Sequence, residues 1–281
     1  MVDDGSTDGS AELLRQYGDR IQLAVFPKNR GALEARNYGA SLATGDYLVF
    51  LDGDDLLTPW SLDVYGSVIR ERDPKLIIGA QNTISKGWMP SPGAQPVPTC
   101  IEFVDYPTLM AKDRPFWVGA SVFVVDRQEF LRVGGWTPDI FEADLWDILA
   151  KLGQAGRAVC ILSPPTSLYR IHESNTIHNV RPFIRMVRRI LQKERDGLYC
   201  ARASGMLRFQ RRAWFGGVAA FWVKRGLREG LYREAAGLAL SGSGLILSAI
   251  MRRLLVVLRG RSPVSTSVLE SCWKSAASLR H

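Results

Sequence analysis

Two short acidic segments contain the residues whose types and spacing could do chemistry. Asp3 and Asp4 stand near the start of the sequence, and Asp52 and Asp54 belong to the run Asp52-Gly53-Asp54-Asp55. Two carboxylates separated by one residue can bind a hard divalent cation such as Mn²⁺ or Mg²⁺, which shares its shell with water and substrate phosphates. Such an ion would stabilise the charge that develops on a diphosphate leaving group. The same residue types also favour turns, so the segment alone is compatible with a polar turn that binds nothing.

Apolar runs alternate with helical patterns and predict an α/β fold whose sheet is mostly parallel. Strands are predicted at 21–26, 47–51 and 76–80, and helices at 11–17, 32–43 and 59–72. Ligands of such sheets bind beyond the carboxyl ends of the strands. Because both acidic segments follow apolar strand material, we expect them to meet at one edge of the sheet.

The middle of the chain is less regular. Residues 86–115 are rich in Pro, Gly and short polar residues, and predict a long loop or a weakly ordered insertion. Further strands are predicted at 116–125, 159–162 and 168–171, with a helix at 142–152. From residue 181 onward the pattern is helical and basic.

The net charge of +8 hides an asymmetry between two parts of the chain. Residues 1–180 sum to −7 and residues 181–281 to +15. We therefore expect a catalytic domain over 1–180 and a basic helical extension over 181–281. Nucleic acid, or an anionic membrane surface with its lipid phosphates, would suit the basic part. The four cysteines are widely spaced and residues 1–20 lack an apolar core segment, so we expect a cytoplasmic protein without a zinc ribbon.

Four segments, in this order, together resemble the family-two glycosyltransferases, which have the GT-A fold. They are Val2-Asp3-Asp4-Gly5-Ser6-Thr7-Asp8-Gly9-Ser10, Asn29-Arg30-Gly31, Ala35-Arg36-Asn37-x-Gly39 and Phe50-Leu51-Asp52-Gly53-Asp54-Asp55. The resemblance covers roughly residues 1–180. It implies an inverting transferase that uses a nucleotide-diphosphate sugar and a divalent metal, Mn²⁺ or Mg²⁺, and it implies no nucleic-acid partner.

The resemblance also assigns roles to the donor site by position. Asp4 looks like the carboxylate that hydrogen-bonds the donor's base, with Asp3 as its neighbour. Arg36 looks like a residue that reaches the nucleotide. Asp52 resembles the first Asp of the Asp-x-Asp motif, facing the ribose or the metal, and Asp54 resembles the second, the metal ligand. Asp3 could instead cap a turn.

Inversion needs a general base that takes a proton from the acceptor hydroxyl. The family provides a Glu-Asp pair at the start of a helix, and the matching stretch here begins at Phe141-Glu142-Ala143-Asp144. The match places Glu142 at the base position, which departs from the family's Asp, with Asp144 as the second candidate. Either carboxylate could instead complement the helix dipole. Trp136 resembles the loop beneath the acceptor, where it could stack on a sugar or belong to the core.

The segment Tyr169-Arg170-Ile171-His172 resembles the family's sequence after the last strand of the catalytic domain. It suggests a phosphate contact for Arg170 and a metal or diphosphate contact for His172, which could equally be structural. The family normally has one more strand and helix ahead of Asp3-Asp4. We therefore expect this chain to lack the central strand and to be poorly stable or inactive by itself.

The tail has an amphipathic pattern. One helical face carries Leu247, Ile250, Met251, Leu254 and Leu258, with Arg252 and Arg259 off that face. The charge-free stretch 235–251 is shorter than the about 20 residues of a spanning helix. A helix lying in a membrane interface and a helical cap packed on the catalytic domain both fit this pattern. The first predicts peripheral binding at the inner face of the plasma membrane.

The sequence thus favours a glycosyltransferase that builds a cell-surface polysaccharide or glycolipid on a saccharide or lipid-linked acceptor. Nucleotidyl transfer also uses paired carboxylates and a metal, but it would want a basic loop near the first strands, and the sequence has none there. The alternative is a truncated, non-catalytic relative that acts as a membrane-associated binding module.

Overall fold

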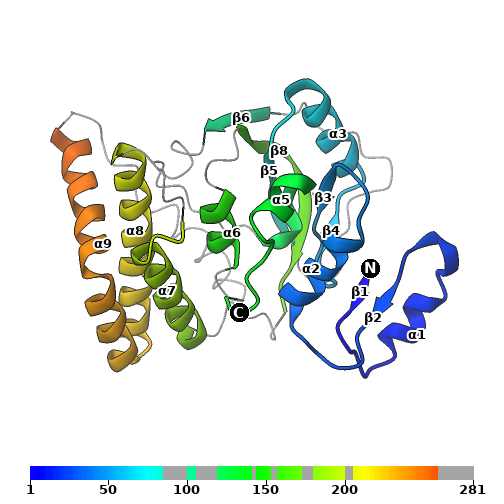
Figure 1. Ribbon diagram of the computed structural model, residues 1–281, viewed down its shortest axis with the longest axis horizontal. Coiled ribbons are helices and arrows are strands. Elements are labelled where there is room, and N and C mark those ends of the chain that lie inside the picture. Colours follow the sequence, from blue (N-terminus) through cyan, green and yellow to red (C-terminus); the bar gives the residue numbers. More distant parts are fainter. Residues whose placement is uncertain are drawn as a thin grey trace. The chain divides into compact units, whose positions relative to one another are not determined.

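The computed structural model describes residues 1–84, 100–105, 119–140, 144–152, 157–172, 180–199 and 205–258 (Figure 1). The chain divides into two compact units. The first comprises Met1–Ile101, Gly119–Ala155 and Val159–Ile171, and the second comprises Glu102–Val118, Gly156–Ala158 and His172–His281. The domain boundary predicted at residue 180 stays a prediction.

The first unit begins with a small parallel sheet that stands apart from the main one. It pairs β1 (Val2–Asp3) with β2 (Ala24–Val25), and the short helices α1 (Ser10–Arg15) and η1 (Gly18–Arg20) lie between them in sequence. The strand predicted at 21–26 and the helix predicted at 11–17 are confirmed in shorter form. The pairing places Asp3 and Asp4 at the carboxyl end of a parallel strand.

The main sheet has six strands. They are β3 (Tyr47–Val49), β4 (Leu56–Leu57), β5 (Leu76–Ile84), β6 (Cys100–Asp105), β7 (Phe123–Asp126) and β8 (Arg157–Arg170), in the order β3-β7-β5-β8-β4 with β6 paired to β8. β7 runs antiparallel to both of its neighbours, β3 and β5. The α/β class is confirmed, but the sheet is mixed and not mostly parallel as predicted. The prediction failed here because the apolar run at 116–125 indicates a strand without indicating its direction. β6 also lies inside the predicted loop 86–115.

The helices of the first unit are α2 (Ala32–Leu42), α3 (Ser61–Arg72), α5 (Arg127–Arg132) and α6 (Asp144–Leu152), and the short helix η2 (Ala120–Val122) precedes β7. The helices predicted at 32–43, 59–72 and 142–152 are confirmed within a few residues. α5 begins where the Asp126 carboxylate accepts a hydrogen bond from the backbone N–H of Glu129, which satisfies one of the open donors of the first turn.

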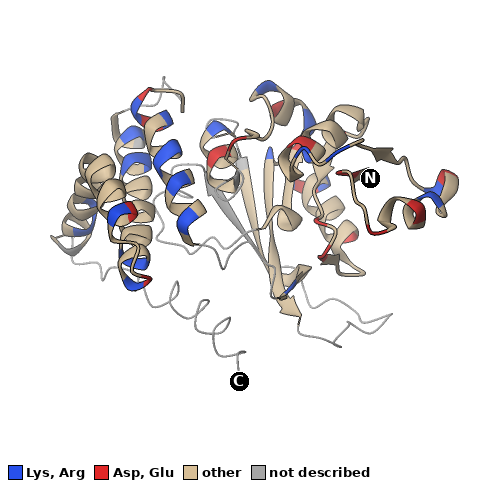
Figure 2. Cartoon of the chain, turned by 90° about the horizontal axis from the view of Figure 1, so that it is seen from below, with Lys and Arg blue, Asp and Glu red and all other residues tan. Residues whose placement is uncertain are grey.

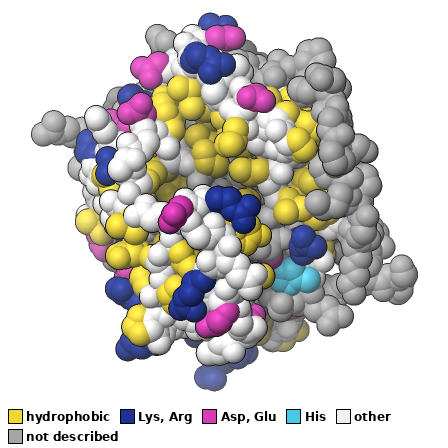
Figure 3. Space-filling model, turned by 90° about the vertical axis from the view of Figure 1, so that its right-hand side faces the viewer, with side chains coloured by type: hydrophobic (Ala, Val, Ile, Leu, Met, Phe, Trp, Pro, Cys, Tyr) yellow, Lys and Arg dark blue, Asp and Glu magenta, His cyan; other side chains and the backbone are white. Residues whose placement is uncertain are grey.

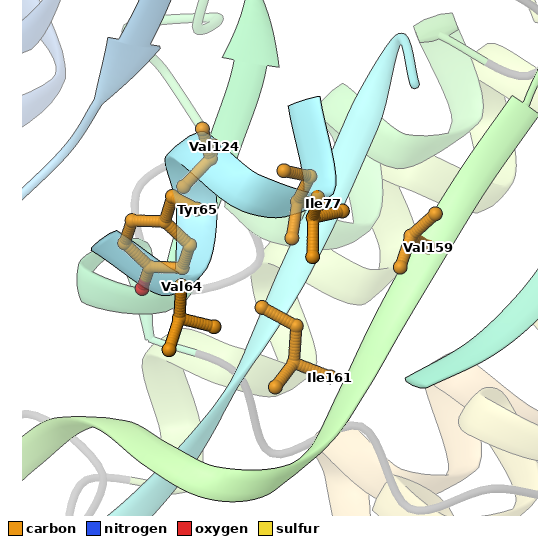
Figure 4. Close-up of a cluster of buried hydrophobic side chains, with 7 residues drawn as sticks. Val64, Tyr65, Ile77, Val124, Val159 and Ile161 are labelled. Carbon is orange, nitrogen blue, oxygen red and sulfur yellow. The ribbon is translucent and has the colours of Figure 1, made fainter. Parts of the chain in front are cut away.

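The core of the first unit lies between α3 and the main sheet (Figure 4). Each contributing element supplies one or more buried apolar side chains: Val64, Tyr65 and Val68 from α3, Ile77 from β5, Val124 from β7, and Val159 and Ile161 from β8. Val159 and Ile161 are two positions apart on β8 and therefore lie on the same face of the sheet, as expected for a strand. This packing fixes the sheet whose strand ends carry the candidate site.

Apolar side chains also reach the surface of the first unit. Figure 3 shows hydrophobic side chains gathered over part of one face, with charged side chains spread around them. Val49 and Leu51, in and after β3, are 38% and 47% exposed. Among the described strands β3 pairs only with β7, so it forms one edge of the main sheet.

The second unit contains three long helices, α7 (Val180–Arg195), α8 (Gly205–Arg228) and α9 (Tyr232–Leu258). On α7 the buried residues share one face: Phe183, Ile184, Val187, Ile190 and Leu191. Phe183 stacks on Trp222 of α8, with ring centroids 4.6 Å apart. The helical pattern predicted from residue 181 is therefore confirmed as a packed bundle.

Gly216→Ala should destabilise this bundle by about 1–3 kcal/mol or more. A Cβ atom at Gly216 of α8 would overlap the backbone carbonyl of Leu245 of α9, so the two helices would have to separate. The matched control is Gly217→Ala, because a Cβ there meets no atom within 4 Å and alanine favours a helix by up to about 1 kcal/mol. Urea unfolding compares the two variants. Equal effects would contradict the close approach of α8 and α9.

Candidate functional site

The first acidic segment is held by the loop before α2. Asp4 Oδ1 accepts from the backbone N–H of Arg30 at 2.7 Å, and Asp4 Oδ2 accepts from that of Gly31 at 2.8 Å. Gly31 has a φ of 95°, a conformation that favours glycine. A Cβ at Gly5 would lie 2.6 Å from the carbonyl carbon of Lys28, so only glycine fits that approach. The first two recognised segments therefore form one structural unit.

Asp3 has a structural contact in this loop. It is 5% exposed, and its Oδ1 accepts from the backbone N–H of Ser6 at 3.0 Å. This is the turn-capping geometry expected of an Asp side chain that precedes a turn. The donor contacts predicted for Asp3 and Asp4 stay predictions, and both carboxylates already hold backbone N–H groups.

The second acidic segment forms a turn after β3 that α2 supports. Asp55 N–H donates to the carbonyl of Asp52 at 3.1 Å, which closes the turn. Arg36 Nη2 of α2 lies 2.6 Å from Asp52 Oδ1, and the two side chains are 14% and 32% exposed. Half-buried charge pairs of this geometry hold both groups in place. The structure thus brings Arg36 and Asp52 together, and the donor contacts predicted for both stay predictions.

Asp55 anchors the same turn from within. It is 5% exposed, and its Oδ2 accepts from Ser121 Oγ at 2.6 Å. Ser121 Oγ in turn accepts from the backbone N–H of Asp52 at 3.1 Å. Burial raises the pKa of the Asp55 carboxyl, and hydrogen bonds from Ser121 and from the Arg170 backbone oppose that rise. Asp55 therefore positions the turn and does not face the solvent.

Arg170 joins this cluster from the end of β8. Its backbone N–H donates to Asp55 Oδ1 at 3.1 Å, and its Nε donates to the carbonyl of Asp54 at 3.0 Å. Burial, together with the charges of the three aspartates, raises the pKa of the neighbouring Tyr169 to about 12. Arg170 is exposed, so its guanidinium lies at the surface beside the Asp54 turn. The phosphate contact predicted for Arg170 stays a prediction.

The residues present fit a divalent ion of the Mn²⁺ or Mg²⁺ type. Within the described ranges, no three His, Cys, Asp or Glu side chains form a ready-made metal site. An ion bound by one or two carboxylates and the phosphates of a substrate does not need one. Asp54 is exposed and Asp52 is partly exposed, and both belong to the same turn. The metal role of His172, a partly exposed residue of the second unit, stays a prediction.

Trp136 belongs to the core, and the stacking role suggested for it is wrong. It is 1% exposed and packs against Phe50, Phe123 and Phe130, with ring centroids 5.4–6.1 Å from its own. The Arg36 guanidinium lies 5.5 Å from the Trp136 ring centroid, within the range of a cation–π contact. Trp136 thus supports the arginine that holds Asp52.

Asn37 fixes the backbone of Trp136. Its Nδ2 donates to the Trp136 carbonyl and its Oδ1 accepts from the Trp136 N–H, both at 2.8 Å. Next to it, Gly135 has a φ of 62°, and Lys151 of α6 donates to the Gly135 carbonyl. These contacts explain the segment Ala35-Arg36-Asn37. Arg36 holds the turn at Asp52, and the adjacent Asn37 holds the loop at Trp136.

Asn37→Ala should lower the free energy of unfolding by about 1–3 kcal/mol, because it leaves the N–H and the carbonyl of Trp136 without this partner. The matched control is Ser41→Ala on the same helix, whose exposed hydroxyl donates to the carbonyl of Tyr38 at 2.7 Å. We expect that control to stay within about 0.5 kcal/mol. Thermal unfolding measures both, and equal losses would contradict the role of Asn37.

The predicted general base falls outside this description. Glu142 lies outside the described residues, and Asp144 begins α6 although the structure describes only its backbone. Asp147, on the same helix, is 1% exposed and accepts from Thr137 Oγ1 at 2.5 Å, so it is structural. The catalytic roles of Glu142 and Asp144 stay predictions.

Sequence reasoning missed Ser121 and the anchoring role of Asp55. Asp55 stood inside the recognised run, but its burial could not be read from the run itself. Ser121 carries no motif. The one available signal was a polar residue next to the apolar run Val122-Phe123-Val124-Val125.

Comparison with known proteins gives one family and one fold. Residues 1–115 match the model of Glycosyl transferase family 2. An uncharacterized glycosyltransferase of Haemophilus influenzae is 45% identical over 60 residues, which are 20% of this chain and 24% of that protein. EpsE of Bacillus subtilis, provisionally named as a glycosyltransferase, is 27% identical over 192 residues, 65% of either chain. These matches span about a quarter and about two thirds of the two relatives.

The fold is shared with a solved structure. S. aureus TarS 1-349 in complex with UDP-GlcNAc superposes with a TM-score of 0.62 at 14% identity, over 88% of this chain and 71% of that chain. At this identity the likeness concerns the fold alone.

Proposed function

Because residues 1–115 match the model of Glycosyl transferase family 2, we propose that the chain is a member of that family and transfers a sugar from a nucleotide-diphosphate sugar to an acceptor hydroxyl. The observation that carries the proposal is the cluster at the end of β3. Arg36, Asp52, Asp54 and Arg170 meet there at one turn, with cationic and anionic groups around exposed carboxylates. This arrangement suits a diphosphate held with a cation. The bound UDP-GlcNAc of the TarS structure supports the donor class.

Each residue of the cluster has a role in this proposal. Asp54 and Asp52 would hold Mn²⁺ or Mg²⁺, which supplies charge stabilisation to the departing diphosphate. Arg36 keeps Asp52 oriented through their 2.6 Å contact. Arg170 places its guanidinium beside the Asp54 turn, where it contacts a phosphate oxygen. Asp3 and Asp4 contribute to the side of the site that receives the base.

The proposed stereochemistry is inversion. Glu142 removes the proton from the acceptor hydroxyl as that oxygen attacks the anomeric carbon, and Asp144 is the second candidate for this base. The acceptor is a saccharide or a lipid-linked saccharide of a cell-surface polysaccharide or glycolipid. The protein acts in the cytoplasm, bound peripherally at the inner face of the plasma membrane.

The proposal is tested by turnover of a panel of nucleotide sugars with Mn²⁺, with Mg²⁺ and with a chelator. We expect one donor to be hydrolysed or transferred in a metal-dependent manner, and ¹H NMR of the product to show the anomeric configuration opposite to that of the donor. Glu142→Gln should lower this rate about 10²–10⁴-fold, the usual contribution of a general base. Binding of a nucleotide sugar without any turnover would indicate the non-catalytic binding module instead.

A further inference from the structure

The helix α9 presents an apolar stripe to the solvent along most of its length. The exposed members of the stripe are Leu240, Leu247, Ile250, Met251, Leu254 and Leu258, each 49–82% exposed. The opposite side of the helix is packed in the bundle, because Leu238 and Leu245 are 0% and 2% exposed. The spacing of the exposed residues by three, four and seven positions places them on one face.

A stripe of arginines on α7 runs beside this apolar stripe. The exposed residues of α7 that share its outer face include Arg181, Arg185, Arg188, Arg189 and Arg195. Figure 2 shows Lys and Arg positions, coloured blue, repeated along the helices of the bundle, with few Asp and Glu positions among them. The guanidinium of Arg188 lies against α9, 3.3 Å from where a Cβ of Gly237 would stand. Gly237 is one turn before Leu240, so the basic stripe borders the apolar one.

The packing of α9 in the bundle bears on whether the helix crosses a bilayer or lies along its surface. Tyr232–Val256 is long and apolar enough to cross a membrane, and 28% of its apolar window is buried. One side of α9 nevertheless packs against α8. A Cβ placed at Gly216 of α8 would overlap the carbonyl of Leu245, and a Cβ placed at Gly242 of α9 would lie 3.4 Å from the Cβ of Ala219. A helix packed in this way, next to an arginine-bearing neighbour, matches one that lies along an interface.

We propose that α7 and α9 form a docking surface for an anionic lipid bilayer. The leucine stripe of α9 enters the boundary between headgroups and acyl chains, while the arginines of α7 contact the lipid phosphates. Apolar burial and attraction of Lys and Arg to anionic lipids act together at such surfaces. This proposal names the residues that would hold the protein at the membrane, and it rests in part on the membrane location given in the proposed function. Its test measures vesicle binding and needs no sugar transfer.

The test is co-sedimentation of the full chain with vesicles of phosphatidylcholine alone and with vesicles containing roughly one third phosphatidylglycerol. We expect binding to the anionic vesicles that weakens when NaCl rises from about 0.1 M to about 0.5 M. Arg185→Glu/Arg188→Glu should weaken the binding about 10–100-fold, since each basic residue near an anionic surface gives about a fivefold effect and the reversal adds repulsion. Leu247→Ser/Leu254→Ser should weaken it about 10-fold or more.

The matched controls carry the same substitutions on exposed residues of the first unit, Arg20→Glu and Leu13→Ser, and should bind as the parent chain does. Circular dichroism confirms that each variant keeps its helices. Equal binding to both vesicle types, loss of binding in the controls, or resistance of bound protein to carbonate extraction would overturn the proposal. A concentration-dependent dimer abolished by Leu247→Ser/Leu254→Ser, without vesicle binding, would assign the stripe to a second copy instead. Asp54→Asn should still bind vesicles, which separates this result from a failure of the proposed activity.

Discussion

Asp54→Asn is expected to lower kcat/KM for the nucleotide sugar about 10²–10³-fold and to remove most of the dependence on Mn²⁺ or Mg²⁺. The amide keeps the size of the side chain but loses the negative charge that a hard cation needs. Asp54 is exposed, and Arg170 Nε holds its main-chain carbonyl, which the substitution leaves in place. The free energy of unfolding should therefore change by less than about 0.5 kcal/mol.

The neighbouring carboxylate provides a contrast. Asp55→Asn should lower stability by about 1–3 kcal/mol, because an amide cannot accept from both Ser121 Oγ and the Arg170 N–H through two carboxylate oxygens. Asp19→Asn, at an exposed residue outside the cluster, is the control for the loss of one negative charge. Titration of donor turnover with Mn²⁺ measures the three variants. An Asp54→Asn enzyme with unchanged metal dependence would remove Asp54 from the metal site.

The expectation that both acidic segments follow strands of one sheet is wrong, because β1 and β3 belong to separate sheets. The contacts between neighbouring segments were more predictable, because the order of the segments is a strong signal. The contacts supply the physical reason. Asp4 binds the backbone of Arg30 and Gly31, and Arg36 binds Asp52, so the segments hold one another. What the segments could not show is the interior support. Ser121 and Trp136 act through burial, which depends on tertiary packing.

The sheet was less predictable than the site. Strand positions follow from apolar runs, but an apolar run does not show in which direction its strand crosses the sheet, and β7 runs antiparallel to β3 and β5. In the tail, the charge-free stretch 235–251 contains several Gly and Ser residues. The structure shows that Gly216 and Gly242 are contact positions where helices approach closely. α9 extends over 27 residues, Tyr232–Leu258, and is longer than the charge-free stretch 235–251.

Arg211→Met is expected to destabilise the second unit by about 3–5 kcal/mol. Arg211 of α8 and Glu194 of α7 form a buried ion pair, with side chains 3% and 1% exposed. The contact is bidentate, with Nε donating to Oε2 at 2.8 Å and Nη2 donating to Oε1 at 3.2 Å. Removing the arginine alone leaves an uncompensated carboxylate in the bundle, and its desolvation is the source of the loss. Hydrogen exchange of the α7 and α8 amides, followed beside urea unfolding, locates the effect in this unit.

A double variant distinguishes the cost of the unpaired buried charge from the loss of packing around the arginine. Attraction between buried charges offsets the cost of taking both from water, so Glu194→Leu/Arg211→Met should recover most of the stability lost in Arg211→Met. The control is Arg15→Met, which breaks an exposed pair with Glu12 whose side chains are 57% and 70% exposed, and should cost less than about 1 kcal/mol. If the double variant is as unstable as Arg211→Met alone, the loss comes from packing around the long arginine stem and not from the unpaired charge. The pair would then hold α7 to α8 mainly through packing. The double variant can regain stability only if the unpaired Glu194 carboxylate causes the loss in Arg211→Met.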